Sequence, residues 1–294
     1  MLRAVVVLCV VGLAAASPVL VRTDEEVQAF RDFLESTKSD DASQFIARSR
    51  ASPSDNAEEN SGKYQGDIVL DDVTIESMVK EYAMGRNAYV YPGTKWPENT
   101  VVWEYAEDQF DDIHKAAIED GIKHIENSTC IKFRYRQPED TNYVSLTGLP
   151  NGCYAHVGYW EERGVHTMNL ALNTPGVGCF RHGTIVHEFM HIIGFFHMQS
   201  THDRDDYVHI ATENIIDGME HNFDIYTSEL VNNLDIEYDY VSCLHYGPRA
   251  FSANGEDTII PLREHEGVMG QRVYITDKDW LRINRHYNCQ GAWN

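Results

Sequence analysis

The clearest pattern of hydrophobic positions lies in residues 107–126, where apolar side chains recur every three to four residues. This spacing predicts an amphipathic helix. Four other segments alternate apolar with polar residues or carry short runs of β-branched and aromatic residues, and each predicts a strand. These segments are 100–105, 131–136, 143–146 and 166–172.

Two more helices are predicted nearer the C-terminus. One follows the Gly-rich turn 175–178 and begins at about Gly183. The other closes the chain at 276–287, where Thr276 and Asp279 are placed as a capping pair. Strands and helices in this order indicate an α+β domain of roughly two hundred residues.

The N-terminal part has a different composition. Residues 17–62 are mainly polar, with one short helix predicted at about 25–34. An extended stretch at 63–72 and a helix at 73–84 follow. Arg86 with Asn87 then offers a small basic site that a trypsin-like protease can cut. We therefore predict a removable segment in front of the main domain.

The first sixteen residues have the pattern of a secretory signal peptide. Arg3 precedes an apolar run, 4–11, and small residues at 14–16 make a suitable cleavage site. The run is too short to span a bilayer as a helix. We therefore predict a secreted, extracellular protein without a membrane partner.

The charge balance narrows the choice of partners. The 294 residues include 46 acidic and 24 basic side chains, a formal net charge of -22. An excess of negative charge repels nucleic acid and anionic membrane surfaces, so neither is expected as a partner. All 14 histidines lie from His114 onward, so the first hundred residues supply no imidazole ligand.

Secretion makes disulfide formation and N-glycosylation possible, which concerns the cysteines and one asparagine. Cys9 leaves with the signal peptide, and five cysteines remain, so disulfides are expected with one thiol left over. Spacing alone leaves the pairing open. Asn127-Ser128-Thr129 is a glycosylation sequon, for which a used and an unused site are both consistent with the sequence.

The motif that carries chemistry is His187-Glu188-Phe189-Met190-His191, followed by Gly194 and His197. Histidines four residues apart lie on one face of a helix, and Gly194 can end that helix so that His197 approaches the same point. Three imidazoles with an open position describe a catalytic zinc site. Glu188 is then placed to act as general base toward the attacking water and to pass the proton to the leaving amine.

With these residues in place, the chain resembles the astacin family of metzincin zinc metalloproteases over about 87–289. Further matching segments are Trp96-Pro97, His182-Gly183-Thr184-Ile185, Asp203-Arg204-Asp205 and Ser242-Cys243-Leu244-His245-Tyr246. The resemblance implies a signal peptide at 1–16, a propeptide at 17–86 and a catalytic domain at 87–294. It also implies a two-lobed fold, with a mixed sheet and the zinc helix in the first lobe and a largely irregular second lobe.

The resemblance assigns further roles at the site. It implies one Zn²⁺ per chain and makes Tyr246 an additional ligand that swings away to stabilise the oxyanion. It makes Asp67, in Tyr64-Gln65-Gly66-Asp67, a zinc ligand in the latent form only, although the simpler alternative is an ordinary Gly-Asp turn. It implies that 166–172 is the edge strand on which an extended peptide or protein substrate lies.

Two disulfides, Cys130–Cys289 and Cys153–Cys179, also follow from the resemblance, and they make Cys243 the unpaired thiol. Arg249 and Arg263 lie near the cleft by the same resemblance and are candidates to favour an acidic residue after the cut.

Three positions depart from the family pattern. Leu244 replaces the methionine of the turn beneath the metal, a change of similar volume. Met198 replaces the glutamate that anchors the new N-terminus after activation, and Thr201 replaces a nearby arginine. These changes place the link between propeptide removal and ordering of the site in question.

We therefore expect a secreted, monomeric zinc endopeptidase made as a latent zymogen and activated by a trypsin-like protease. A secreted zinc-binding pseudoenzyme or decoy is the main alternative, supported by Met198 and Thr201. A structural zinc protein, for which Glu188 would have no role, is another.

Overall fold

The computed structural model describes residues 22–37, 61–83, 95–106, 108–226 and 233–294. The predicted signal peptide and the predicted cleavage site at Arg86 lie outside these ranges. Within them, no helix has both the length and the apolar character needed to cross a membrane.

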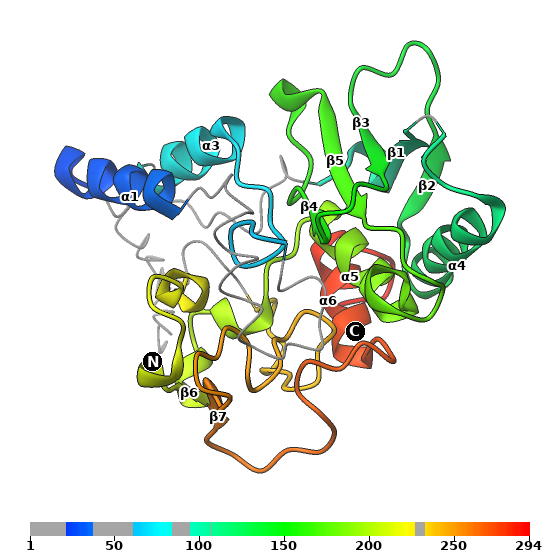
Figure 1. Cartoon of the computed structure of the whole chain (residues 1–294). Helices are drawn as coiled ribbons and strands as arrows, with labels where there is room; N and C mark the ends of the chain where they lie inside the picture. Colours follow the sequence, from blue (N-terminus) through cyan, green and yellow to red (C-terminus); the bar gives the residue numbers. More distant parts are fainter. Residues whose placement is uncertain (1–21, 38–60, 84–94, 107, 227–232) are drawn as a thin grey trace, which may run out of the picture.

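A five-stranded mixed sheet forms the first lobe, in the order β2-β1-β3-β5-β4 (Figure 1). Strands β2, β1, β3 and β5 run parallel to one another, and β4 pairs antiparallel with β5. The strand bounds are Thr100–Tyr105 for β1, Lys132–Tyr135 for β2, Tyr143–Thr147 for β3, Cys153–Ala155 for β4 and Val165–Leu170 for β5. The four predicted strands are thus confirmed, and β4 is an addition.

The prediction that 166–172 forms the edge strand is wrong. The segment 166–172 corresponds to β5, which has β3 on one side and β4 on the other. The outermost strand on this side of the sheet is β4, whose three residues are all buried and too few to show a period. Alternation of apolar residues predicts a strand but carries no information on which neighbours it pairs with.

Two helices pack with this sheet around the main hydrophobic core. They are α4, Asp112–Ser128, and α5, His182–Ile192, which contact each other. Helix α4 begins later than the predicted position 107 because the Asp111 carboxylate caps it. That carboxylate accepts hydrogen bonds from the backbone N–H groups of Ile113 and His114.

In its described residues, the second lobe holds a short sheet, several 3₁₀ turns and one α-helix. The sheet pairs β6, Val208–Ile210, with β7, Ile259–Pro261. The helix is α6, Asp277–His286, and Thr276 and Asp279 form the predicted capping box at its start. An aromatic-rich cluster fills this lobe, including Phe223, Tyr238, Tyr246 and Phe251.

The residues before the predicted cleavage site, called here the N-terminal segment, pack onto both lobes. Helices α1, Asp24–Thr37, and α3, Asp72–Ala83, lie against each other, as Figure 1 shows, and confirm two predicted helices. The rings of Phe30 and Tyr82 stack between them at 4.4 Å. Apolar residues of this segment share one buried cluster with side chains from the main domain, namely Val157, Phe196 and Tyr226.

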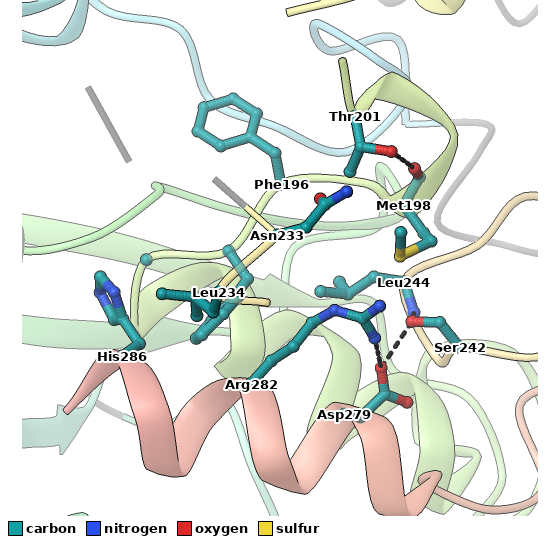
Figure 2. Close-up of a pocket in the computed structure, with 12 residues that line it drawn as sticks. Phe196, Met198, Thr201, Asn233, Leu234, Ser242, Leu244, Asp279, Arg282 and His286 are labelled. Carbon is teal, nitrogen blue, oxygen red and sulfur yellow. Dashed lines mark hydrogen bonds and ion pairs between the residues drawn. The ribbon is translucent and has the colours of Figure 1, made fainter. Parts of the chain in front are cut away.

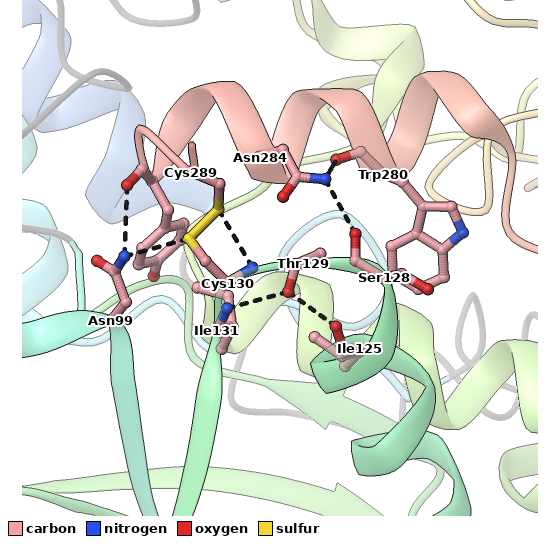
Figure 3. The surroundings of a disulfide bond; sticks show 10 residues. Asn99, Ile125, Ser128, Thr129, Cys130, Ile131, Trp280, Asn284 and Cys289 are labelled. Carbon is pink, nitrogen blue, oxygen red and sulfur yellow. Dashed lines mark hydrogen bonds between the residues drawn. A yellow bond between two sulfur atoms is a disulfide. The ribbon is translucent and has the colours of Figure 1, made fainter. Parts of the chain in front are cut away.

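Both expected disulfides are present. Cys130–Cys289 joins the end of α4 to the chain just after α6, and Cys153–Cys179 joins β4 to the segment before α5. Figure 3 shows that hydrogen bonds surround the first bridge, including one from the Asn284 amide to the Ser128 carbonyl at 3.0 Å. The two lobes are therefore tied covalently.

Candidate metal centre and active site

Helix α5 positions the first two histidines of the motif. Residues 183–192 of this helix are all buried, and the His187 and His191 rings lie 4.7 Å apart on one face. The helix approaches the second lobe closely at Gly183, where an added Cβ would lie 2.3 Å from the Arg272 carbonyl oxygen. Glycine is therefore required for α5 to begin at this place.

A sharp turn brings in the third histidine. Gly194 has a φ of +106°, and its N–H donates to the His191 carbonyl at 2.8 Å. A left-handed residue ends the helix as the sequence predicts. His197 follows, and its ring lies 4.9 Å from that of His191 and 5.5 Å from that of His187.

The outer nitrogen of each imidazole is held in place. Nδ1 of His187 is 2.7 Å from the Cys243 carbonyl oxygen, and Nδ1 of His191 is 2.7 Å from that of Phe195. Nδ1 of His197 is 3.1 Å from Oε1 of Gln65. Because these partners are acceptors, each Nδ1 carries the proton and each Nε2 presents a lone pair inward.

The Asp67 carboxylate lies where the three lone pairs converge. Its Oδ2 is 3.0 Å from Nε2 of His187, and its Oδ1 is 3.2 Å from Nε2 of His197 and 3.5 Å from that of His191. One donor atom from each of the four residues lies within 4.8 Å of all the others, and all four side chains are buried.

This donor set fits zinc. Burial lowers the pKa of His187 and of His197 to about 4, so both rings are neutral, as metal ligands must be. Three inward lone pairs and a carboxylate in a dry cluster need a cation between them. Three imidazole nitrogens and one carboxylate oxygen are an established ligand set for a tetrahedral zinc ion.

Glu188 and Tyr246, the other predicted site residues, adjoin the cluster. Glu188 follows His187 on α5 and is fully buried. The Tyr246 ring lies 4.7 Å from the His197 ring, and its hydroxyl donates to the Gln65 carbonyl oxygen at 2.5 Å. In this structure the Tyr246 hydroxyl is therefore held by the N-terminal segment.

Gln65 is a site residue that the sequence analysis missed. Besides its contacts with His197 and Tyr246, its side-chain amide donates to Ser200 Oγ at 3.0 Å. Gln65 has a φ of +46° and Gly66 a φ of +82°, a tight turn that presents both Gln65 and Asp67 to the cluster. The Gly-Asp pair indicates such a turn, but nothing in its residue types indicates that Gln65 faces inward.

The three positions that depart from the family pattern lie together in space. Met198, Thr201 and Leu244 all line one cavity of about 40 Å³ (Figure 2). The charged groups of this cavity come from α6, where Asp279 Oδ1 lies 3.8 Å from Arg282 Nη1. Cys243, outside both disulfides, is buried, and its thiol donates to the Gly183 carbonyl oxygen at 3.2 Å.

The two arginines named as candidates near the cleft both contact side chains of the second lobe. Arg249 forms an exposed ion pair with Asp257 at 3.2 Å. The Arg263 guanidinium lies 4.1 Å from the Tyr207 ring.

The fold and the donor set are those of a zinc-dependent peptidase. The family model of Astacin, a peptidase family, matches residues 88–288. The chain belongs to the astacin family, and it is accordingly a zinc metalloendopeptidase.

Curated relatives and a solved structure agree with this assignment. Zinc metalloproteinase nas-4 of Caenorhabditis elegans is 36% identical over 233 residues, which cover 79% of this chain and 71% of that protein. Seminal metalloprotease 1 of Drosophila melanogaster is 37% identical, covering 78% and 87%. Human meprin A subunit beta is 36% identical over 78% of this chain but only 30% of its own length. The structure of high choriolytic enzyme 1, a hatching enzyme zinc-protease from medaka, is 34% identical with a TM-score of 0.59, over 67% of this chain and 94% of that one.

Proposed function

We propose that this protein is a secreted astacin-type endopeptidase held in a latent form by its own N-terminal segment. The observation that carries this proposal is the position of Asp67, whose two carboxylate oxygens lie 3.0–3.5 Å from the three ligand nitrogens. A carboxylate held there excludes a water molecule and a scissile carbonyl from the same place. The N-terminal segment, 17–86, then acts as a propeptide, and cleavage near Arg86 releases it.

The ligands are His187, His191 and His197 in both forms, with Asp67 in the latent form. When bound, zinc lowers the pKa of a coordinated water toward about 7 and polarises the scissile carbonyl. Glu188 takes the proton of the attacking water and passes it to the leaving amine. Once Gln65 has left, the Tyr246 hydroxyl is released to donate a hydrogen bond to the developing oxyanion.

The proposed mode of substrate binding follows from the outer edge of β4. The N-terminal segment already occupies that edge, because the Ala155 N–H donates to the Asp67 carbonyl and the Val69 N–H donates to the Ala155 carbonyl, both at 2.9 Å. An extended peptide can make the same backbone bonds with β4 once the segment has gone. The substrate is therefore a protein or peptide in extended conformation, bound by a monomeric enzyme outside the cell.

The proposal is tested by casein hydrolysis with the purified precursor, before and after limited trypsin treatment. We expect activity to appear only after trypsin. The Glu188→Ala variant, treated in the same way, should bind zinc but hydrolyse no casein above background. Full activity of the uncut precursor would contradict latency, and activity of Glu188→Ala would contradict the role of Glu188 as base.

A further inference from the structure

A second carboxylate of the N-terminal segment enters a charged site in the main domain. The Asp71 carboxylate accepts two hydrogen bonds from Arg163, Nε to Oδ2 at 2.9 Å and Nη2 to Oδ1 at 2.8 Å. His156 Nε2 lies 3.1 Å from the same Oδ2. A guanidinium that donates to both carboxylate oxygens, with a third donor beside it, binds a carboxylate strongly and with defined geometry.

One donor of this site, His156, is oriented by the main domain itself. His156 directly follows β4, and its Nδ1 accepts the Thr167 backbone N–H at 2.8 Å. The His156 proton therefore resides on Nε2, which points at the carboxylate. Arg163 ends the 3₁₀ turn Glu161–Arg163; with the N-terminal segment in place its side chain is only 3% exposed, and it also donates to Thr74 Oγ1 of that segment.

Removal of the N-terminal segment leaves this site without its anion. Among the described residues, Asp71 is the carboxylate that pairs with Arg163, and Arg163 Nη1 has no hydrogen-bond partner there even while Asp71 is bound. A guanidinium that has lost its counter-charge, with the His156 N–H donor beside it, favours a carboxylate that can reach it.

The site lies along the path that a substrate takes. Asp71 is four residues beyond Asp67, and Ile68 between them forms a parallel bridge with Ala155 on the edge of β4. Four extended residues span at most about 14 Å. A peptide that follows the course of the N-terminal segment, with its scissile bond at the metal centre, therefore brings a residue three or four positions from that bond close to Arg163.

We propose that Arg163 and His156 form a subsite for the carboxylate of an acidic substrate residue, three or four residues from the scissile bond. Asp71 occupies this subsite in the latent form, as Asp67 occupies the metal centre. The inference rests on the proposed function, because it requires substrate to replace the N-terminal segment on β4.

The first test uses the activated wild-type enzyme and a series of fluorogenic peptides. Each peptide carries Asp or the isosteric Asn at one position on either side of a fixed cleavage site. We expect Asp to be preferred over Asn by about tenfold in kcat/KM at one position three or four residues from the cut. An Asp/Asn ratio near one at all of those positions would overturn the subsite. Failure to cleave every peptide, including the Asn series, would instead contradict the proposed function.

Variants then tie the preference to the two side chains. Arg163→Gln should reduce the Asp/Asn ratio to about one, mainly through KM, and Arg163→Lys should restore part of it. Arg134→Gln is the matched control, since Arg134 also binds an aspartate, Asp140, with two nitrogens but lies on β2, at the opposite edge of the sheet from β4. A ratio that stays high in Arg163→Gln would refute the assignment. If Arg163→Gln does not fold, His156→Gln and the wild-type series still decide, because the proposal requires a reduced ratio in the first and a preference in the second.

Discussion

At the scale of single residues, the turn formed by residues 65–67 contacts much of the polar machinery of the metal centre. Asp67 faces the three ligand nitrogens, the Gln65 side chain holds the outer nitrogen of His197, and the Gln65 carbonyl accepts from Tyr246. Latency in the proposed mechanism therefore has two parts, a blocked ligand position and an engaged oxyanion donor.

Replacing Asp67 should separate these two parts. Asp67→Ala removes the fourth ligand and its charge-assisted contacts, which are worth roughly 3 kcal/mol, or about a hundredfold in the population of the open form. We expect the uncut variant to cleave casein without trypsin. We also expect it to lose zinc to a chelator faster than the wild-type precursor does, as measured by atomic absorption after timed dialysis. Equal rates of zinc loss in the two proteins would show that Asp67 is not a ligand.

Tyr246 offers a second prediction at this scale. Tyr246→Phe keeps the packing but removes the hydroxyl, so the activated variant should lose roughly a hundredfold in kcat with little change in KM. Steady-state kinetics on one peptide measure both constants. Tyr240→Phe is the control, since its hydroxyl bonds the Tyr207 carbonyl in the second lobe. An unchanged kcat in Tyr246→Phe would exclude the oxyanion role.

At the scale of elements, the short strand β4 connects the sheet to the N-terminal segment. Its inner side pairs with β5, and its outer side takes the N-terminal segment through two backbone hydrogen bonds at Ala155. The segment therefore binds as an additional strand of the sheet, and the same backbone groups serve substrate in the proposed function.

Val69→Pro tests this strand contact without touching the metal centre. Proline removes the N–H that donates to the Ala155 carbonyl, a loss of about 1 kcal/mol, so the segment should open about fivefold more often. The expected result is a several-fold rise in the basal activity of the uncut precursor and faster activation by trypsin. Val69→Ala, which keeps the N–H, should behave like the wild type. Equal activity of the two variants would show that this hydrogen bond does not hold the segment.

The same elements show what the sequence could and could not predict. The capping box at Thr276 and the helix termination at Gly194 are local, and the structure confirms both. The edge of the sheet is a long-range property: the resemblance assigned it to 166–172, and the pattern of that strand could not correct the assignment because it does not identify the strand's neighbours. Gln65 was missed because its inward direction depends on a turn against the second lobe. The paired arrangement of Asp71 with Arg163 joins residues 92 apart in sequence and leaves no local signal.

At the scale of the whole molecule, the two disulfides close loops of very different length. Cys130–Cys289 spans 159 residues and ties the lobes together, whereas Cys153–Cys179 spans 26 and braces β4. In the chain-entropy model the longer loop is worth about 5 kcal/mol and the shorter about 3.5 kcal/mol.

Removing each bridge should therefore have a distinct effect. The double variant Cys130→Ser, Cys289→Ser should show the larger fall in unfolding free energy in urea, with kcat nearly intact below its transition. Cys153→Ser, Cys179→Ser should show the smaller fall but a raised KM, because the edge strand loses its brace. Circular dichroism and peptide kinetics measure these effects. The reverse order of KM effects would contradict the link between β4 and substrate binding.

The way the N-terminal segment is seated has a consequence for how activation proceeds. A single cut near Arg86 breaks none of the contacts at Asp67, Ala155 or Arg163. The cut changes only the effective concentration of the N-terminal segment at the site. That concentration falls from roughly millimolar for a tethered segment to the concentration of free segment in solution. In the proposed function, a concentrated store of cut enzyme therefore stays inhibited, and it becomes active when it is diluted or when the released segment is degraded.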